Sequence, residues 1–394
     1  MKKILTLLIL LTLAGTNAFC QTVDTSLSRH DFFYAGQSKR MRMFIVKGGK
    51  VTWEYEYTDG KGEFSDAMLL SDGHILVAHM YGIFELTQDK KMLWHYDAPQ
   101  GNEIHTVQPI GKSHIVFVQN GHPAKVIVMK IPSLEIVKEF TIPSTTSGSV
   151  HGQFRNARLT SRGTLLVANM SQGFVAEYNS NGQEIDRWTG MLPWSVQEME
   201  KGNFLITGRK GYIQEINRQG QTVWDLNTTT FGFNQPQKIV RLKNGHHIVN
   251  NWFNEWDKIP IDTANGPLQA VELDEKNNVV WKLQQWKNPD LGPSTTIQLL
   301  SQPVSRDRLF FGEFGARKPK LFVGPNKPMG VGKGVNPGRV AWVHNPGVAK
   351  WDGKTGLWVE DRWNDQEKAD KLVSEAVLQL TGEKTVAAGW NALF

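Results

Sequence analysis

A ten-residue stretch early in the chain shows how most of the protein is built: Met68-Leu69-Leu70-Ser71-Asp72-Gly73-His74-Ile75-Leu76-Val77. Apolar residues on both sides of a Ser-Asp-Gly turn predict two short antiparallel strands. The same arrangement returns around Gly163, Gly202 and Gly245, and in a looser form over 107–118. A pattern that recurs in this way indicates a repeat architecture.

Each copy is followed by a second pattern, in which a strand, a polar turn and another strand end in a large aromatic residue. This residue marks the fourth strand of each repeat, and the set is Trp53, Trp94, Phe140, Trp188, Trp224 and Trp281. The spacings of roughly 36 to 57 residues match the ~40–50 residues of a propeller blade. The repeat is therefore a small four-stranded sheet.

Counting the repeats predicts an all-β fold, a six-bladed β-propeller over residues 24–303, with seven blades as the alternative. Five complete units begin near Glu63, Glu103, Gln153, Trp194 and Gln235. A sixth unit has only its last three strands at the N-terminus, and its missing first strand appears at 295–300. A blade shared between both ends of the chain closes the ring and removes exposed sheet edges. We expect a linker over 304–319 and a small mixed C-terminal segment over 320–394.

The first twenty residues are typical of a signal peptide. Lys2 and Lys3 precede an apolar run about ten residues long, which is too short for a transmembrane segment. We therefore expect export to the periplasm or the medium, and Phe19 disfavours lipidation of the single cysteine, Cys20. The net charge of +6 comes without a Lys/Arg run, so no nucleic-acid partner is expected.

Two resemblances accompany these patterns. Blade strings such as 194–206 (WSVQEMEKGNFLI) resemble the quinoprotein-like and arylsulfotransferase-like propellers of exported bacterial proteins, which implies the fold and carries no activity with it. The stretch 324–346, with Trp351-Asp352-Gly353 and Asp361-Arg362-Trp363, resembles the start of exported members of the domain of unknown function 362 family. That second match covers about 75 residues of a much longer family domain, and no catalytic residue is carried over from it.

In a propeller, the first strand of each blade begins on one face, and the loops between second and third strands lie on the same face around the central channel. Ligand sites are usually found on this face, so we select the candidate site residues from it. The predicted ligand-binding residues on this face are Asp66, Lys39, Arg40, His79, Trp194, Arg209, Lys210 and Gln237, with Trp252, Glu255 and Trp256 in an insertion that resembles a sugar-stacking platform. Cationic and imidazole side chains favour a carboxylate, sulfate or phosphate on the ligand. The expected partner is therefore an acidic glycan or another anionic small molecule.

The first functional interpretation is a uronate-directed polysaccharide lyase. Arg155 would neutralise the sugar carboxylate, His105 or His151 would act as base, and Tyr81 would act as acid. The alternatives are a non-catalytic propeller that binds glycan or protein, and a sulfotransferase-like enzyme suggested by the fold alone. No cofactor and no metal site are expected, although a channel metal held by His105 and His151 is a weaker alternative. The oligomeric state is left open.

Overall fold

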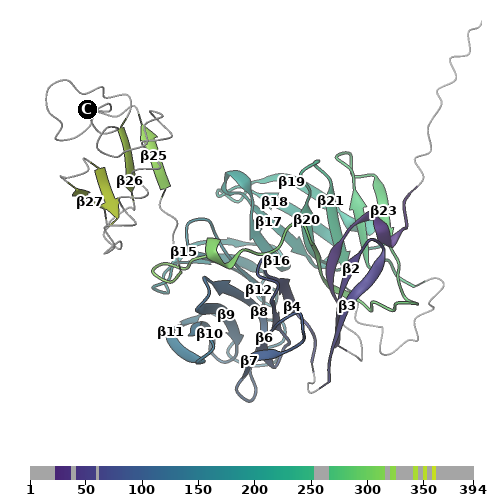
Figure 1. Cartoon of the computed structure of the whole chain (residues 1–394), viewed down its shortest axis with the longest axis horizontal. Helices are drawn as coiled ribbons and strands as arrows, with labels where there is room; N and C mark the ends of the chain where they lie inside the picture. Colours follow the sequence, from purple (N-terminus) through teal and green to yellow (C-terminus); the bar gives the residue numbers. More distant parts are fainter. Residues whose placement is uncertain are drawn as a thin grey trace, which may run out of the picture. The chain divides into compact units, whose positions relative to one another are not determined.

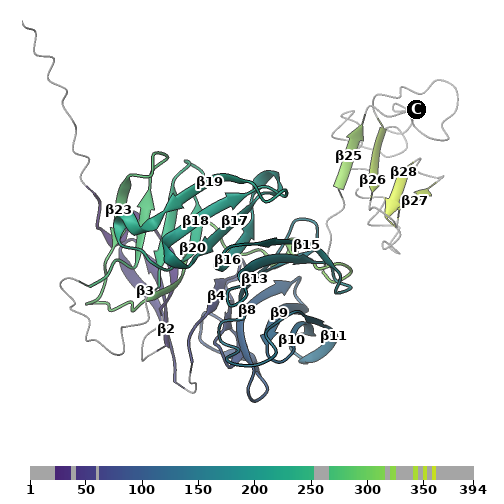
Figure 2. The same cartoon turned by 180° about the vertical axis from the view of Figure 1, so that it is seen from behind.

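The computed structural model describes residues 23–36, 41–58, 62–252 and 266–315, and four short strands between residues 320 and 360. Within these ranges, the strands form six four-stranded antiparallel sheets and two small two-stranded sheets. Figure 1 and Figure 2 show the six larger sheets from opposite sides, arranged in a ring. The all-β, six-bladed propeller is thus confirmed, and the seven-bladed alternative is excluded. No helix in the described part of the chain has the length and apolar character needed to cross a membrane.

In each blade the strand nearest the channel comes first in sequence, except in blade 1, where it comes from the other end of the chain. Blade 1 contains β24 (Ser294–Leu299), β1 (Phe32–Gly36), β2 (Met41–Lys47) and β3 (Lys50–Tyr57). Blade 2 contains β4 (Asp66–Leu69), β5 (Ile75–Ala78), β6 (Gly82–Leu86) and β7 (Met92–Asp97). Blade 3 contains β8 (Glu103–Ile110), β9 (His114–Asn120), β10 (Ala124–Lys130) and β11 (Glu135–Ile142).

The remaining three blades follow the same order. Blade 4 contains β12 (Phe154–Leu159), β13 (Leu165–Asn169), β14 (Phe174–Tyr178) and β15 (Glu184–Thr189). Blade 5 contains β16 (Pro193–Glu198), β17 (Phe204–Gly208), β18 (Tyr212–Ile216) and β19 (Thr222–Asn227). Blade 6 contains β20 (Pro236–Arg241), β21 (His247–Asn251), β22 (Ala270–Leu273) and β23 (Val279–Leu283). Short 3-10 helices lie at Leu27–Arg29, Glu200–Gly202, Arg209–Gly211, Thr228–Phe231 and Arg306–Arg308.

The ring closes in blade 1, as the sequence predicted. β24 pairs antiparallel with β1, so that Phe32 lies opposite Leu299 and Tyr34 opposite Ile297. Residues about 260 positions apart are thereby joined in one sheet. Figure 1 shows the consequence, with the purple N-terminal strands beside the green β23 of blade 6.

The hydrophobic core of the ring consists of six clusters, each of which lies between two consecutive blades. In β1, Phe33 and Ala35 pack toward blade 2, whereas Phe32 and Tyr34 pack toward blade 6. Successive residues of a strand point to opposite faces of its sheet, and both faces of each blade are covered here. This is why middle strands such as β5 and β9 read as nearly continuous apolar runs.

Three of the repeated tryptophans donate a hydrogen bond that joins consecutive blades. Trp53 Nε1 of blade 1 donates to the carbonyl of Gln88 in blade 2 at 2.6 Å. Trp188 Nε1 of blade 4 donates to Arg218 O of blade 5 at 3.1 Å. Trp281 Nε1 of blade 6 donates to Ser26 O, in the segment that leads into blade 1, at 2.9 Å. The residue used to count the repeats is therefore a contact between them.

Residues 304–315 pack against the propeller, although we had expected a linker over 304–319. Val304 forms a bridge with Leu70, and Phe311 is buried in the cluster between blades 3 and 4. Arg306 is buried and pairs with Asp72 at 2.8 Å and with Glu85 at 2.5 Å. The compact unit that contains the ring extends accordingly to Ala316.

The second compact unit begins at Arg317, and its described residues are all in strands. β25 (Lys320–Gly324) pairs with β26 (Val340–His344), and β27 (Ala349–Asp352) pairs with β28 (Leu357–Glu360). The expected signal peptide at 1–20 lies outside the described residues, as does most of the segment 320–394.

Candidate functional site

The inner strands carry a β-bulge at the level where the channel opens. In β12, pairing passes from Phe154–Asn169 to Asn156–Ala168, which leaves Arg155 as the extra residue. Equivalent bulges occur in four other inner strands. The residues without a paired residue on the neighbouring strand are Trp194 in β16, Gln237 in β20, Thr295 in β24 and the pair His105-Thr106 in β8. A bulge re-aims a side chain and is common beside functional sites. Four residues predicted from the sequence lie at this level.

Three of the predicted catalytic residues come together here. Arg155 NH1 lies 3.2 Å from His105 Nε2 and 3.1 Å from His151 Nε2. Two carboxylates that were not predicted complete the group. Glu63 forms an ion pair with Arg155, and Glu103 contacts the imidazoles of His105 and His151. We name this group the histidine cluster, and its members are Glu63, Ser65, Glu103, His105, His151 and Arg155.

Both ring nitrogens of His105 are engaged. Glu103 Oε2 lies 2.7 Å from His105 Nε2 and 2.8 Å from His151 Nδ1. On the other side of the ring, Ser65 Oγ lies 2.7 Å from His105 Nδ1 and 3.0 Å from Glu63 Oε1. His105 is fully buried, whereas the His151 side chain is 42% exposed, so the cluster has one closed side and one open side.

The two carboxyl groups of the cluster are ionised. Burial raises the pKa of Glu63, but the charge of Arg155 and the hydrogen bond with His105 outweigh it and hold that pKa well below its usual range. Burial also raises the pKa of Glu103, but hydrogen bonds from His105 and His151 bring it down to about 2. Burial and the charge of Arg155 lower the pKa of His105. Counting the guanidinium and the two carboxylates alone, the cluster carries one excess negative charge.

Arg155 is held in place by aromatic side chains. Its guanidinium carbon lies 5.0 Å from the centre of the Trp194 ring, which in turn lies 5.2 Å from Trp252. With its amide oriented to suit both neighbours, Gln237 accepts from Trp194 Nε1 at 3.1 Å and donates to Thr295 O at 3.2 Å. Both tryptophans are mostly buried, so they support Arg155 and offer little open surface for stacking a sugar.

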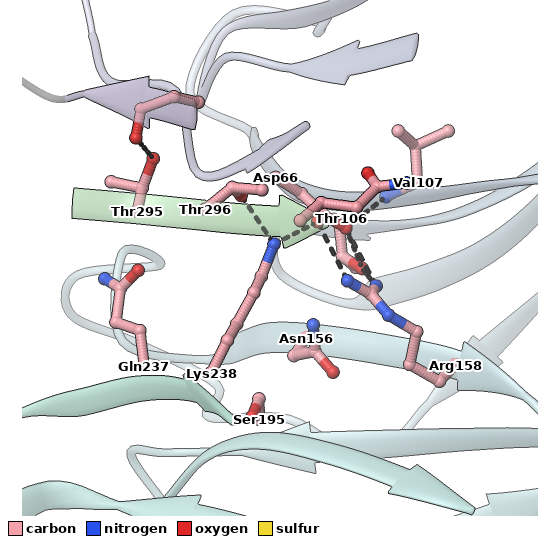
Figure 3. A network of polar contacts seen from close by, with 12 residues as sticks. Asp66, Thr106, Val107, Asn156, Arg158, Ser195, Gln237, Lys238, Thr295 and Thr296 are labelled. Carbon is pink, nitrogen blue, oxygen red and sulfur yellow. Dashed lines mark hydrogen bonds and ion pairs between the residues drawn. The ribbon is translucent and has the colours of Figure 1, made fainter. Parts of the chain in front are cut away.

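At the bulges or directly after them, each blade contributes one polar residue to the channel: Asp66, Thr106, Asn156, Ser195, Lys238 and Thr296. Asp66 is fully buried and accepts from Arg158 NH1 and NH2, and from Lys238 Nζ, each at 2.8 Å. Lys238 also donates to Thr296 Oγ1 at 2.7 Å. Figure 3 shows these bonds crossing between blades, and we call Asp66, Thr106, Arg158, Lys238 and Thr296 the channel network.

The charges of the channel network are fixed by their pairing. Burial raises the pKa of Asp66, but the charges of Arg158 and Lys238 and their hydrogen bonds outweigh it and bring the pKa down to about 2. Asp66 was predicted to bind ligand. Its oxygens are instead occupied by protein donors, which makes it a tie between blades 2, 4 and 6.

The other predicted residues lie apart from the histidine cluster or on its rim. His79 is buried against Tyr57 and His95, and burial lowers its pKa to about 4. Arg209 and Lys210 are exposed in the turn between β17 and β18.

Tyr81 is 43% exposed. Met80 and Ile104 exchange two backbone hydrogen bonds, which brings the Tyr81 loop to the strand of Glu103 and His105. Predicted residues that fall outside the described ranges are Lys39, Arg40, Glu255 and Trp256.

The carboxylates that pair with the predicted residues were not predicted from the sequence. Glu63 and Glu103 served only to mark the start of blades, although each lies two residues before another member of the histidine cluster, Ser65 or His105. That repeated spacing was the available signal. Glu103, His105 and His151 also place one possible ligand atom each within 4.8 Å of one another. No metal site was expected from the sequence, and this grouping favours the channel metal that was the weaker alternative.

Comparison with known proteins bears on the fold alone. No family model matches the chain, and no curated protein does. Neither the quinoprotein-like resemblance nor the one at 320–394 is therefore confirmed. Among solved structures the chain is similar to a protein of unknown function from Bacteroides caccae, with 22% identity and a TM-score of 0.58, over 68% of this chain and 97% of that one. A catalytically inactive variant of virginiamycin B lyase from Staphylococcus aureus, solved with quinupristin, aligns with 15% identity and a TM-score of 0.46, over 68% and 89% of the two chains.

Proposed function

We propose that this protein is an exported enzyme that binds an acidic carbohydrate at the mouth of the channel and cleaves it by β-elimination, as a uronate-directed polysaccharide lyase does. The observation that carries the proposal is the convergence of Arg155, His105 and His151 within 3.2 Å on the bulged inner strands. A positive group beside two imidazoles is the combination that proton abstraction next to a carboxylate requires.

The reaction requires a base, an acid and a positive group. A base takes the proton from the carbon next to the sugar carboxylate, and the electrons of that C–H bond form a carbon–carbon double bond. The glycosidic C–O bond then breaks, and the leaving oxygen takes a proton from an acid. A positive group at the carboxylate stabilises the charge that develops between these events.

The described residues differ in how well they are placed for these three roles. His151 is the better base, because it is partly exposed whereas His105 is fully buried. Arg155 pairs with Glu63, its side chain is only 2% exposed, and its buried Nε–H has no acceptor among the described residues, so the proposed role in neutralising the carboxylate requires the ligand to enter the channel. Tyr81 stays the proposed acid, since its loop is joined by backbone hydrogen bonds to the strand of the cluster.

The test follows the ultraviolet absorbance of unsaturated uronate while the protein is incubated with a panel of uronate-containing polysaccharides. We expect turnover in the wild type and a loss of about 100-fold or more in Arg155→Ala and in His151→Ala, the usual range for removing a positioned acid–base group. His114→Ala, an imidazole at the start of β9 and outside the cluster, should keep full activity. Unchanged turnover in Arg155→Ala would refute this assignment.

A non-catalytic glycan-binding propeller is the second candidate, favoured by the exposed cations Arg209 and Lys210 in the turn between β17 and β18. It predicts glycan binding that weakens in a double Arg209→Ala, Lys210→Ala variant while no product forms. The sulfotransferase-like alternative gains no observation from the site. Export is part of the proposal. Cleavage of the signal peptide after Ala18 or after Cys20 would give a mature chain that starts at residue 19 or 21, and N-terminal sequencing is the measurement that checks it.

A further inference from the structure

We propose that Glu103 Oε2, His105 Nε2 and His151 Nδ1 form a three-ligand site for a divalent transition-metal ion, for which Zn²⁺ is the appropriate probe. The inference deepens the proposed function, because it names an ion for the same site. Only the role of the ion in catalysis rests on that function, since binding of the ion is measured without any substrate.

The ligand types and their spacing suit such an ion. Two imidazole nitrogens and one carboxylate oxygen, with a further position open, are a common ligand set for catalytic zinc. The three atoms lie within 4.8 Å of one another, and the carboxylate oxygen is 2.7 and 2.8 Å from the two nitrogens. Bonds of about 2.1 Å at a tetrahedral angle separate ligand atoms by about 3.4 Å. The two separations between Glu103 Oε2 and the imidazole nitrogens therefore have to lengthen by about 0.6–0.7 Å when an ion is bound.

His105 Nε2 has neighbours that no single protonation state satisfies. It lies 2.7 Å from an acceptor, Glu103 Oε2, and 3.2 Å from a donor, Arg155 NH1. A ring nitrogen presents either a hydrogen or a lone pair, so one of these contacts is always unfavourable. A metal ion between Nε2 and Glu103 removes the difficulty, because both then offer lone pairs to the ion.

The groups behind His105 match the outer contacts of a metal-bound imidazole. With Nε2 on the ion, Nδ1 carries the hydrogen and donates to Ser65 Oγ at 2.7 Å, and Ser65 donates to Glu63 Oε1 at 3.0 Å. A ring N–H directed toward a carboxylate, here through a hydroxyl, fixes the tautomer and orientation of such a ligand. Arg155 NH1 keeps an acceptor in this state, the carbonyl of His151 at 3.3 Å.

The charge of the histidine cluster explains what the ion would add. One guanidinium and two carboxylates leave one excess negative charge, which opposes an acidic ligand. A divalent ion reverses this to one excess positive charge on the open side of the cluster. In the ion-bound protein His151 holds the ion through Nδ1 and cannot also act as the base, so the loss of turnover expected for His151→Ala then comes from loss of the ion.

The test is isothermal titration calorimetry of the untagged full chain with Zn²⁺, with Ca²⁺ in a parallel titration. We expect one Zn²⁺ per chain, no comparable binding of Ca²⁺, and at least a 100-fold weaker Zn²⁺ affinity in Glu103→Gln and His151→Ala. Ser65→Ala, which removes only an outer contact, should weaken binding by about 10-fold. His114→Ala is the matched control for a stray imidazole and should bind as the wild type does.

Circular dichroism establishes that each variant is folded. If a ligand variant does not fold, the Zn²⁺ affinity of Ser65→Ala decides the outcome. Wild-type protein that binds no Zn²⁺, or binds it equally well after Glu103→Gln, overturns the inference. Zn²⁺ binding without unsaturated product supports the metal site and removes the lyase. Product formation that resists EDTA in a protein that binds no Zn²⁺ leaves the lyase and removes the metal site.

Discussion

Replacing Asp66 with asparagine tests whether the channel network holds the ring together. The substitution keeps the size of the side chain but removes the only carboxylate of the network, and so leaves Arg158 and Lys238 facing each other across the channel. Breaking a buried ion pair by removing one partner typically costs about 3–5 kcal/mol of folding free energy. We therefore expect Asp66→Asn to lower the free energy of unfolding by about that amount at neutral pH.

The pKa of Asp66 gives a second measure of the same contribution. A fall from 3.8 to about 2 is nearly two units, and each unit corresponds to about 1.4 kcal/mol, so the shift corresponds to roughly 2.5 kcal/mol. Because the pKa is lower in the folded state, the stabilisation is complete above pH 3.8 and is lost as the pH falls through 3.8 toward 2. The asparagine variant should lack this loss.

Urea unfolding followed by tryptophan fluorescence, from pH 7 down to pH 3, measures both effects. Adding Lys238→Met to Asp66→Asn removes one of the unpaired cations and should recover part of the stability. A destabilisation below about 1 kcal/mol at pH 7, or an acid dependence in the variant equal to that of the wild type, would show that the ion network contributes little and that the six apolar interfaces suffice.

Three further outcomes follow from the fold. A chain that ends at residue 292 lacks β24 and should aggregate on size-exclusion chromatography, whereas a chain that ends at residue 316 should stay monodisperse; equal behaviour would contradict closure through blade 1. Burial lowers the pKa of His79 and His247 from 6.5 to about 4, so stability is complete above pH 6.5 and falls as the pH drops toward 4. Replacing both with glutamine should flatten that dependence in urea titrations, and an unaltered slope would argue against it. Arg306→Ala leaves the buried Glu85 with one cation fewer and should cost about 3 kcal/mol in thermal or urea unfolding, whereas the exposed Arg308→Ala should be neutral.

The blades were predictable because their signals are local. A turn glycine such as Gly163, at φ +73°, and an outer-strand tryptophan lie within one hairpin of the apolar residues that they organise. The shared blade could also be predicted, since one incomplete unit at each end of the chain implies a common sheet. The packing of residues 304–315 could not, because those residues bury Phe311 and Arg306 without any blade pattern.

The sequence predicted which residues lie at the start of the inner strands, but it did not predict which side chains pair with one another there. The start of each inner strand could be placed, which selected His105, Arg155 and Trp194. A bulge, however, is a difference in residue number between two paired strands, and the periodicity of a single strand does not reveal it. Glu63 and Arg155 are 92 residues apart, so nothing local indicated that the predicted cation already has a carboxylate partner.

The closure of blade 1 sets an order of events during synthesis. β1 is among the first strands to be made, and its partner β24 follows about 260 residues later. At roughly 5–20 residues per second, the edge of β1 waits about 13–50 s for its partner. Until then five blades and part of a sixth form an open arc in which β1 lacks its partner, and an unpaired edge of this kind can join to other chains. Completion of the ring is thus a late step, and a factor that shields β1 in the meantime would raise the yield of folded protein more than one that speeds the folding of any single blade.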